Sequence, residues 1–544
     1  MEVWNYANLW ESVAAATPDN PALVHGSRVV LWRGFDARAN ALARRFLDAG
    51  LTHQSKVAAY LYNGPEYLET YFAAFKAGLV PFNTNYRYGG DELIYLFENA
   101  DAEAVVFHAS FAPTIDKVRG RLPKVKLWLA VAEEGSPVPP WADDYETVVG
   151  KGADHVEAPW GRSSDDLVFM YTGGTTGMPK GVMWRQEDLF KSLGGGANLL
   201  AGIPAMERVA EAGERAKAGL LPERPIAIPA APLMHATAQY ISFGQLVAGG
   251  TVVTLPSRKF DAGELFDEIE RRSATSLIIV GLAFAAPMLE ALDANPGRWT
   301  LPSLRRIVSS GVMWSAENKA GLLRHLPNIV LFDSLGSSEA PGLAGSMSNA
   351  ADTGKTAKFA VGANAAVFTE DGVRVEAGSG VRGLLAVGGY TPVGYYKDEA
   401  KSAATFRNFE GQRWSVPGDW ATVEADGSVT LLGRGSQVIN TGGEKVFPEE
   451  VEEALKRFPG IRDAAVVGVP DPRFGERICA VVDAGDNRPT LAELAAHVKT
   501  LLADFKAPRE LVLAPVVRSP NGKLDYKAVK ALAVSRTTPA GAVA

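Results

Sequence analysis

Short apolar segments alternate with helical segments along the first part of the chain, and this alternation limits the fold more than any other feature. The segments KVAAYLY (56–62) and AEAVVFH (102–108) have the continuous apolar character of buried strands. Residues 66–78 and 91–100 place apolar side chains at helical spacing, and the alternation returns over 250–281. Strands that alternate with helices predict an α/β fold with parallel strand pairing.

The pattern changes in the second half of the chain. After about residue 380, short strands separated by turn residues predict a small β-barrel-like part. From residue 438 onward, strand and helix patterns predict a small α+β domain, and residues 535–544 have the composition of a disordered tail. A chain of 544 residues is long enough for several domains. The predicted fold class is therefore α/β, with a large N-terminal domain of α/β layers and the barrel-like part, followed by the α+β C-terminal domain.

Charge and composition exclude several classes of protein. The formal net charge of −7 argues against nonspecific binding to nucleic acid. A single cysteine, Cys479, excludes an internal disulfide and is typical of a reducing compartment. The sequence contains no membrane-length apolar run and no basic segment of a signal peptide at its start. These features predict a cytoplasmic protein.

The stretch YTGGTTGMPKGVMW (171–184) follows a strand pattern and precedes a helical pattern at 184–193. A glycine-rich turn exposes successive backbone N–H groups, which bind anionic oxygen. The threonine hydroxyls add further donors and Lys180 adds a positive charge, so the loop can hold a polyphosphate. It is not a Walker A loop, because Met, Pro and Lys follow Gly177. The alternative interpretation of this loop taken alone is a mobile surface loop.

Six further motifs follow this loop, and together they identify a family. The loop resembles the phosphate loop of the AMP-forming acyl- and aryl-CoA synthetases, which are related to firefly luciferase and to peptide-synthetase adenylation domains. The later motifs are similar to those of the same family and occur in the family's order over nearly the whole chain. They are PLMHATA (232–238), SSGVMWS (309–315), DSLGSSE (333–339), PGDW (417–420), GRGSQVINTGGEKVFPEEVE (433–452) and SPNGKLDY (519–526).

The resemblance implies a two-step reaction. A carboxylate and ATP give an acyl-adenylate and pyrophosphate, and the acyl group then passes to a thiol, usually that of CoA. A carboxylate is a poor electrophile, and AMP supplies the leaving group that it lacks. The first step brings two anions together, so catalysis depends on charge stabilisation and positioning. The implied cofactors and co-substrates are ATP, Mg²⁺ and CoA.

The resemblance also implies a nucleotide site. The loop from Thr172 to Lys180 would hold the β- and γ-phosphates. Gly311 and residues 333–338 would line the adenine slot, and Asp419 would bind the ribose hydroxyls. The residues implied to bind ATP or AMP are Thr172, Gly173, Gly174, Thr175, Thr176, Gly177, Gly311, Asp333, Ser334, Leu335, Gly336, Ser338, Asp419 and Arg434.

The implied catalytic residues are Lys523, Glu339 and Lys180. Glu339 would hold Mg²⁺ together with Thr176, since hard cations prefer oxygen ligands. Lys523 would neutralise the charge that develops during adenylation. Taken alone, Glu339 is an ordinary surface glutamate and Lys523 a residue of a surface turn. Only the order of the motifs gives them these roles.

Domain movement is a further implication of the resemblance. The implied division is an N-terminal adenylate-forming domain at 1–433, a hinge at 434–437 and a mobile C-terminal domain at 438–544. The C-terminal domain would swing between the two half-reactions. Gly442 and Gly443 would then lie beside the tunnel that admits the pantetheine of CoA.

Some positions depart from the family pattern. Leu335 stands where a tyrosine usually stacks on adenine, Ser338 replaces a threonine, and Ser436 replaces the usual acid or lysine of the hinge. The family resemblance can also be narrowed. The motifs DSLGSSE (333–339) and GRGSQVINTGGEKVFPEEVE (433–452), together with KGVMWRQEDLF (180–190) and PVGYYKDEAKSAATF (392–406), look most like those of CoA ligases for sterol side chains and other bulky acids.

The acyl pocket is implied to involve His235, Ser310, Met313 and Trp314. The stretch around His235 has no acidic residue to bind an amine, which argues against an amino-acid substrate. Large apolar residues fit a hydrophobic acid, although such residues are also common in an ordinary core. His235 could equally be a core histidine whose hydrogen bonds are made within the protein. The favoured substrate is a bulky acid with a steroid side chain or an aryl-alkanoic skeleton.

Other functions remain open from sequence alone. They are a medium- or long-chain fatty acyl-CoA ligase, an adenylating protein that loads a carrier protein, a catalytically silent ligand-binding relative and a luciferase-like oxygenase. The presence of both lysines, Glu339, Asp419 and Arg434 argues against the silent relative. The expected partners are small molecules, with a homodimer as a possibility.

Overall fold

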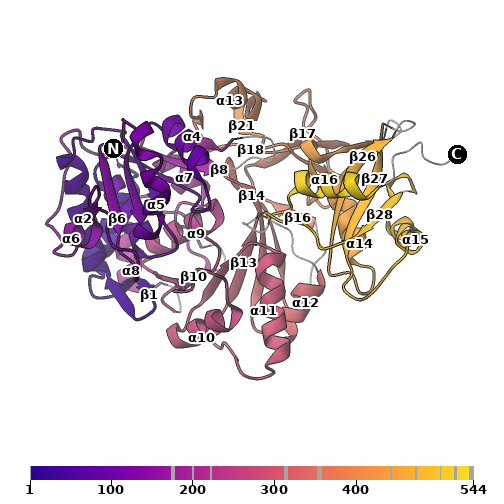
Figure 1. The fold of residues 1–544 in the computed structure, drawn as a ribbon, viewed down its shortest axis with the longest axis horizontal. Coiled ribbons are helices and arrows are strands. Elements are labelled where there is room, and N and C mark those ends of the chain that lie inside the picture. Colours follow the sequence, from indigo (N-terminus) through magenta and orange to yellow (C-terminus); the bar gives the residue numbers. More distant parts are fainter. Residues whose placement is uncertain are drawn as a thin grey trace.

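Three β-sheets and the helices that cover them make up the described part of the chain (Figure 1). The computed structural model describes residues 2–172, 178–198, 201–220, 223–311, 316–351, 358–441, 444–471, 475–502, 504–519 and 523–537. Within these ranges, the side chains at positions 434, 436, 440, 444, 445 and 475 are not part of the description.

The first sheet lies at the left of Figure 1 and is parallel over most of its width. Its central strands are buried on both faces, as their continuous apolar sequences predict. The last two strands in its order, which come from later in the chain, pair antiparallel. In sheet order, beginning from the opposite edge, the strands are β7 (Asp143–Asp144), β6 (Leu127–Val131), β5 (Ala102–His108), β3 (Lys56–Tyr60), β4 (Val80–Asn83), β8 (Leu167–Thr172), β9 (Lys180–Arg185) and β19 (Gly394–Tyr395).

The second sheet is the largest and changes from parallel to antiparallel along its width. Its parallel part comprises β1 (Pro21–His25), β11 (Thr251–Thr254), β10 (Ile226–Pro229), β12 (Ser276–Ile279), β13 (Arg306–Ser310) and β14 (Val330–Ser337), with β2 (Arg28–Leu31) antiparallel at the edge. Its antiparallel part comprises β15 (Ala340–Ser348), β16 (Lys358–Val361), β23 (Val429–Arg434), β22 (Asp419–Val423), β18 (Arg382–Val387), β17 (Ala365–Phe368), β21 (Gln412–Ser415) and β20 (Phe406–Phe409). The predicted barrel-like part thus continues the parallel sheet within the described residues, rather than forming a separate unit.

The third sheet lies at the right of Figure 1 and belongs to the C-terminal part. It is mixed, because the last strand pairs in parallel with β27 while the other pairs are antiparallel. Its strands are β24 (Ile439–Thr441), β25 (Glu444–Val446), β26 (Asp463–Asp471), β27 (Gly475–Asp483) and β28 (Glu510–Leu513). A short 3₁₀ turn, Gly435–Gln437, joins the second sheet to the third. The predicted hinge falls on this turn, and its movement remains a prediction.

Helices cover the sheets, and those predicted over 66–78 and 91–100 are confirmed as α3 and α4. The α-helices are α1 (Tyr6–Ala16), α2 (Trp32–Asp48), α3 (Pro65–Lys76), α4 (Gly90–Ala100), α5 (Ala112–Asp116), α6 (Tyr145–Val149), α7 (Gln186–Ser192), α8 (Glu211–Ala218), α9 (Ala236–Val247), α10 (Ala262–Arg272), α11 (Leu282–Ala294), α12 (Ala316–His325), α13 (Glu399–Thr405), α14 (Pro448–Lys456), α15 (Leu491–Leu501) and α16 (Tyr526–Arg536). None of the helices in the described ranges combines the length and apolar character of a membrane span.

Two sequence predictions were wrong in detail. The helix expected over 184–193 begins at Gln186, because Trp184 and Arg185 complete β9. The tail expected to be disordered from residue 535 begins with the end of α16, which continues to Arg536. Residues 538–544 of that tail lie outside the described residues.

An aromatic core fixes α9, the helix that begins next to the candidate site. Phe243 of α9 packs on Trp10 of α1 and on Phe75 of α3, with ring centroids 5.4 and 5.8 Å apart. Trp10 also packs on Phe35 and Phe72, and all of these rings are buried. Such pairs stabilise a fold beyond the area that they bury.

We expect Phe243→Ala to lower the free energy of unfolding by about 3–5 kcal/mol. The substitution leaves a cavity, and the packed rings around it cannot move in to fill the space. Urea unfolding of the part that contains α9 measures this loss. The matched control is Met347→Ala, since Met347 is 54% exposed. Equal, small effects of both changes would contradict the assignment of this core.

Candidate active site

Several predicted site residues, among them Ser310, Gly311 and Ser334, lie near the carboxyl ends of the parallel strands of the second sheet. Ser310 ends β13 and lies opposite Ser334 of β14 in the parallel register. The hydroxyl of Ser309 accepts a hydrogen bond from the Gly281 N–H at 2.9 Å, which joins the loops after β12 and β13. Ligands of open α/β sheets bind outside the carboxyl ends of the strands. The location therefore fits a substrate site.

Two asparagines, the buried Asn83 and the half-buried Asn63, join this edge to the first sheet. Asn83, at the end of β4, donates from its amide to the carbonyls of Tyr171 (2.8 Å) and Met234 (2.7 Å) and accepts from the Tyr171 N–H (2.7 Å). Asn63 donates to the carbonyl of Ala231 and accepts from the Leu233 N–H, at 3.1 and 2.7 Å. These bonds hold the start of the phosphate loop against the segment that leads to His235. Sequence reasoning missed both asparagines, although a polar residue at the end of a buried strand was a usable signal.

Lys523 reaches the site from the C-terminal part of the chain. A Cβ atom placed on Gly311 would lie 3.7 Å from the Cε of Lys523, so the lysine side chain passes directly over this glycine. Gly311 has a φ of +85°, a conformation that favours glycine. The structure thus brings together Lys523 and Gly311, which lie more than two hundred positions apart in the sequence.

His235 caps the N-terminal end of α9 and is neutral at ordinary pH. Burial is the main cause that lowers its pKa, and the positive charges of Lys523 and Arg87 add to it, so that the pKa falls to about 3. The Nε2 atom of His235 is buried and has no hydrogen-bond partner among the described residues. Buried polar atoms usually have partners, so this atom is a candidate contact for a bound substrate.

Tyr395 lies between Lys180 and Glu339, and Asp398 pairs with Lys180; sequence reasoning missed both Tyr395 and Asp398. Lys180, the first residue of β9, forms an ion pair with Asp398 at 2.5 Å and lies 5.9 Å from the ring centre of Tyr395. The Tyr395 hydroxyl donates to Glu339 Oε1 at 2.7 Å. The Lys180 ammonium holds the pKa of Asp398 below its usual range. Both missed residues lie in the stretch 392–406, whose family resemblance was the available signal.

Glu339 lies in a turn that is held on two sides. Ser415 donates a hydrogen bond to its carbonyl at 2.7 Å, and the indole of Trp184 donates to the carbonyl of Ser338 at 2.9 Å. Among the described residues no group of three or more His, Cys, Asp or Glu side chains can hold a metal ion. A single carboxylate fits Mg²⁺, which keeps most of its ligands as water and phosphate oxygen.

Other predicted nucleotide residues have structural contacts of their own. Asp333 is buried and ion-paired with Lys319, which holds α12 against β14. Leu335 is half-buried and packs on an apolar cluster of the antiparallel part. A Cβ atom on Gly336 would lie 3.1 Å from the carbonyl oxygen of Ala340, so the close hairpin favours glycine here.

Asp419 lies beside the turn between the second and third sheets. It is buried, begins β22 and faces Arg434 of β23 in the antiparallel register. This places the predicted ribose ligand next to the predicted hinge. The Arg434 side chain, residues 173–177, Met313, Trp314, Gly442 and Gly443 lie outside the described residues.

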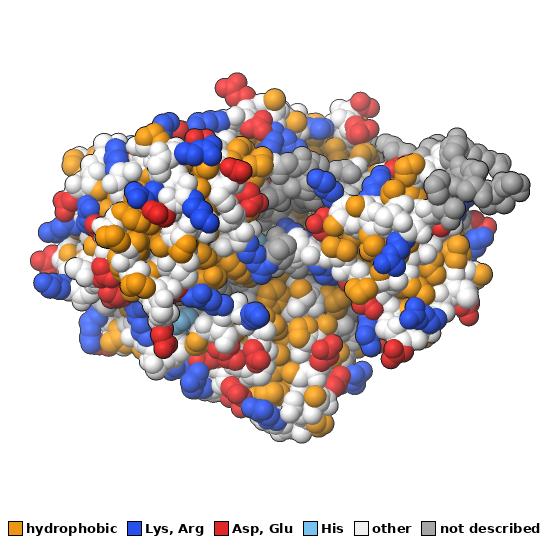
Figure 2. All heavy atoms as spheres, viewed as in Figure 1, with side chains coloured by type: hydrophobic (Ala, Val, Ile, Leu, Met, Phe, Trp, Pro, Cys, Tyr) orange, Lys and Arg blue, Asp and Glu red, His pale blue; other side chains and the backbone are white. Residues whose placement is uncertain are grey.

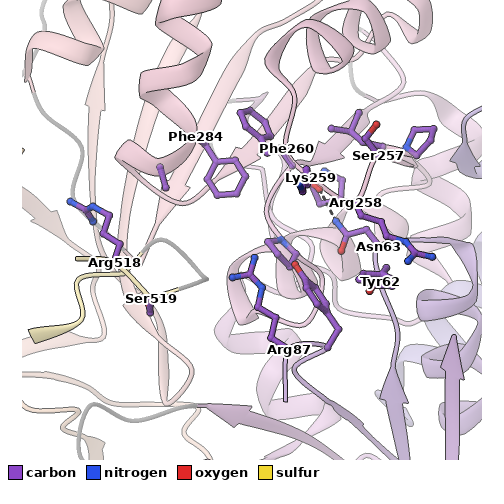
Figure 3. A pocket seen from close by; sticks show the side chains of 17 residues that line it. Tyr62, Asn63, Arg87, Ser257, Arg258, Lys259, Phe260, Phe284, Arg518 and Ser519 are labelled. Atoms are coloured by element: carbon purple, nitrogen blue, oxygen red, sulfur yellow. Dashed lines mark hydrogen bonds between the residues drawn. The ribbon is translucent and has the colours of Figure 1, made fainter. Parts of the chain in front are cut away.

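A cavity of about 450 Å³ opens between the C-terminal part and the edges of the other two sheets. Figure 3 shows Arg518 and Ser519 on one side and Arg87, Asn63 and Arg258 on the other. The described lining residues include cations and no acid. Figure 2 shows the surface hollowed near the place where the two parts meet. Of these cations, Arg258 is ion-paired with Glu133 and Arg518 with Asp463, so part of the positive charge is already balanced.

Comparison with known proteins decides the family. Residues 10–396 match the model of the AMP-binding enzyme family, and residues 450–523 match its C-terminal domain. The chain belongs to the AMP-binding enzyme family. It is 41% identical over 540 residues to "Medium/long-chain-fatty-acid--CoA/3-oxocholest-4-en-26-oate--CoA ligase" of Mycolicibacterium smegmatis, which covers 97% of the chain and 96% of the relative.

Further relatives agree with this membership. The "3-oxocholest-4-en-26-oate--CoA ligase" of Rhodococcus rhodochrous is 40% identical over 539 residues, covering 97% of this chain and 95% of the relative. Among solved structures, the anthranilate CoA ligase AuaEII in complex with anthranoyl-AMP has a TM-score of 0.80 at 20% identity, covering 98% of each chain. ATP-bound MatB from Rhodopseudomonas palustris has a TM-score of 0.79 at 23% identity, covering 97% and 99%.

These findings confirm the family resemblance, the α/β fold with a large N-terminal and a small C-terminal domain, and the activity of an AMP-forming acyl-CoA ligase. ATP and CoA fit as its substrates. The roles of individual residues and the domain boundaries stay predictions.

We expect Tyr395→Phe to raise the Mg²⁺ concentration needed for half-maximal pyrophosphate release by about tenfold, because the Glu339 carboxylate loses the donor that orients it. Pyrophosphate release titrated with Mg²⁺ measures the shift. Tyr390→Phe, in the same segment but 43% exposed, is the matched control. An unchanged Mg²⁺ requirement in Tyr395→Phe would show that Tyr395 does not orient the metal ligand.

Proposed function

We propose that this ligase activates a bulky hydrophobic carboxylic acid, with Lys523, Lys180 and Glu339 stabilising the charges of the adenylation step. The observation that carries the proposal is the position of Lys523 over Gly311 and close to His235. One lysine of the C-terminal part would thereby join the predicted nucleotide site to the predicted acyl site. In the adenylation step a carboxylate oxygen bonds to the α-phosphorus of ATP and pyrophosphate leaves.

The charges of this step are distributed among groups from different strands. Lys180 would bind the terminal phosphates, and the ion pair with Asp398 holds its ammonium at the start of β9. Lys523 would bind the oxygens between the α- and β-phosphates, where negative charge grows as the bond to pyrophosphate breaks. Mg²⁺, held by Glu339 with the predicted Thr176, would supply further positive charge at the phosphates.

The second half-reaction needs no further charged group from this arrangement. The CoA sulfur bonds to the acyl carbon and AMP leaves, while the thiol proton is released to solvent. Asp419 would hold the ribose of AMP through both steps. The proposed swing of residues 438–544 about 434–437 would replace Lys523 by the segment that contains Gly442 and Gly443.

The proposed substrate is a steroid side-chain acid. A neutral His235 and the buried Met234 fit an uncharged acyl group better than a substrate with an amine. The relatives named above are described as ligases of 3-oxocholest-4-en-26-oate, and one of them also of medium- and long-chain fatty acids. Fatty and aryl-alkanoic acids are therefore the competing substrates in the test.

The experiment incubates the protein with ATP, Mg²⁺ and a panel of steroid side-chain, aryl-alkanoic and fatty acids, with and without CoA. We expect the highest kcat/KM for pyrophosphate release with the steroid acid, and thioester only when CoA is present. A higher kcat/KM with a plain fatty acid would overturn the substrate assignment. Adenylate that accumulates and is not consumed by CoA would contradict the second step.

Lys523→Ala should slow adenylation by about a hundredfold or more, because loss of one charge donor at a transition state commonly costs this much. Thioester formation from supplied acyl-adenylate and CoA should stay within about twofold, since the lysine acts before that step. Rapid-quench assays of the separate half-reactions measure both rates. Equal losses in the two half-reactions would refute the assigned role.

The low pKa of His235 has a consequence for pH dependence. An imidazole with a pKa of about 3 stays neutral at pH 5 and above, so it does not titrate over the working range. We expect His235→Gln to change the size of kcat but not the shape of its pH profile between about pH 5 and 9. An inflection near the ordinary histidine pKa that is present in the wild type and absent from the variant would contradict this.

A further inference from the structure

The hairpin that carries Lys523 is anchored to the core of the C-terminal part at both of its ends. Ser519 donates from its backbone N–H (2.7 Å) and from its hydroxyl (2.9 Å) to the carbonyl of Lys523. The Asp525 N–H donates to the carbonyl of Val517 at 3.1 Å. The lysine thus lies on one arm of a narrow, hydrogen-bonded hairpin. The direction of the Lys523 side chain therefore depends on the contacts that hold the two arms of the hairpin.

The first arm is held by an ion pair. The Arg518 guanidinium donates to Asp463 Oδ2 from Nε at 3.0 Å and from a terminal nitrogen at 2.7 Å. Asp463 is the first residue of β26, and its other carboxylate oxygen accepts from the Ala464 N–H at 2.9 Å. A carboxylate that is itself fixed to the backbone gives the arginine one defined position.

The second arm is held by a buried carboxylate. Tyr526 follows Lys523 by three positions and begins α16, and its hydroxyl donates to Glu452 at 3.1 and 3.3 Å. Glu452 lies on α14, is 2% exposed, and also accepts from the Val466 N–H of β26 at 2.9 Å. Asp525 caps α16 by accepting from the Ala528 N–H at 2.9 Å. The start of α16 therefore has one fixed place on the sheet.

Burial of the Glu452 carboxylate has a desolvation cost. Burial raises the pKa of Glu452 to about 7, although Lys456, the Val466 amide and the Tyr526 hydroxyl favour the ionised form. An apolar residue would fill the same space on α14 without this cost. An apolar residue could not accept the hydrogen bond that the Tyr526 hydroxyl donates to Glu452.

We propose that Glu452 and Tyr526 are positioning residues that aim Lys523 at Gly311 during adenylation. α14, α16 and β26 lie together at the right of Figure 1, so the bond joins a helix on the sheet to the arm that leads back to the active site. The inference rests on the proposed role of Lys523 and adds the residues through which the C-terminal core controls it.

Tyr526→Phe should slow adenylate formation about ten- to a hundredfold, because a displacement of about 1 Å at a reacting group costs this much. It should leave thioester formation from supplied acyl-adenylate within about twofold, since that step does not use Lys523. A loss confined to the first half-reaction is not expected from a general loss of stability. Equal losses in both half-reactions would overturn the proposal.

Combination with Lys523→Ala tests whether Tyr526 acts through the lysine. In that background Tyr526→Phe should cause no further loss of adenylation, because a residue that acts only through Lys523 has no effect once the lysine is removed. A further loss of about tenfold or more would show that Tyr526 acts independently of Lys523 and would overturn the proposal.

Two variants serve as controls. Glu452→Gln keeps an oxygen that accepts from Tyr526 and Val466, so it should stay within about threefold of the wild type, whereas Glu452→Ala should match Tyr526→Phe. Lys530→Ala, also on α16, removes only a partly exposed ion pair with Glu476 and should leave both half-reactions unchanged. A Glu452→Gln loss as large as that of Glu452→Ala would count against the proposed acceptor role.

The outcomes separate the two levels of the argument. If Lys523→Ala does not slow adenylation, the role of the lysine in the proposed function is wrong. If Lys523→Ala slows adenylation and Tyr526→Phe does not, the proposed function stands and the positioning role of Glu452 and Tyr526 is wrong.

Discussion

Hydrogen bonds from two asparagines, the buried Asn83 and the half-buried Asn63, hold the two large sheets together at the place where the substrates would meet. A carbonyl or an N–H group that is buried without a partner costs about 1–3 kcal/mol. Asn83 satisfies the carbonyls of Tyr171 and Met234 with one amide group, and Asn63 satisfies three backbone groups of the segment before His235. The start of the predicted phosphate loop at Tyr171 and the segment before His235 are therefore linked by shared hydrogen bonds. Movement of either sheet would break several of these bonds at once.

The arrangement of charge follows from this rigid edge. The reaction brings anions together, and in the proposed function positive charge would come from separate places: Lys180 from β9 and Lys523 from the C-terminal part. Tyr395 joins the first of these to Glu339, because its ring lies near Lys180 and its hydroxyl binds the glutamate. Lys180 and Glu339 are held by neighbours before any substrate binds, through Asp398 and Tyr395. Such preorganisation is what makes electrostatic stabilisation effective in a transition state.

The C-terminal part combines a firm interior with a single short connection. Its own sheet and helices bury an apolar core, and the turn Gly435–Gln437 links it to the second sheet. The hairpin of Lys523 is bonded to that interior at both arms, so the lysine would move with the domain as a unit. A domain that carries its catalytic group rigidly can deliver it in one orientation and remove it in another.

Much of the fold could be predicted from the sequence because the relevant signals are local. The alternation of apolar and helical segments identified β3, β5, α3 and α4 to within one or two residues. The end of the chain was less predictable: no helix was predicted over residues 526–534, and the buried face of α16 is defined by its packing on β26.

The sequence by itself determined the family, the reaction class and the identity of the candidate charged residues, since these depend on the kind and order of residues in short motifs. Only the tertiary structure decided which of them meet. Lys523 and Gly311, Tyr395 and Glu339, and Tyr526 and Glu452 are pairs far apart in the chain, and no local pattern specifies their contact. The physical reason is that sheet order and domain docking set these distances, and both depend on the packing of the whole core.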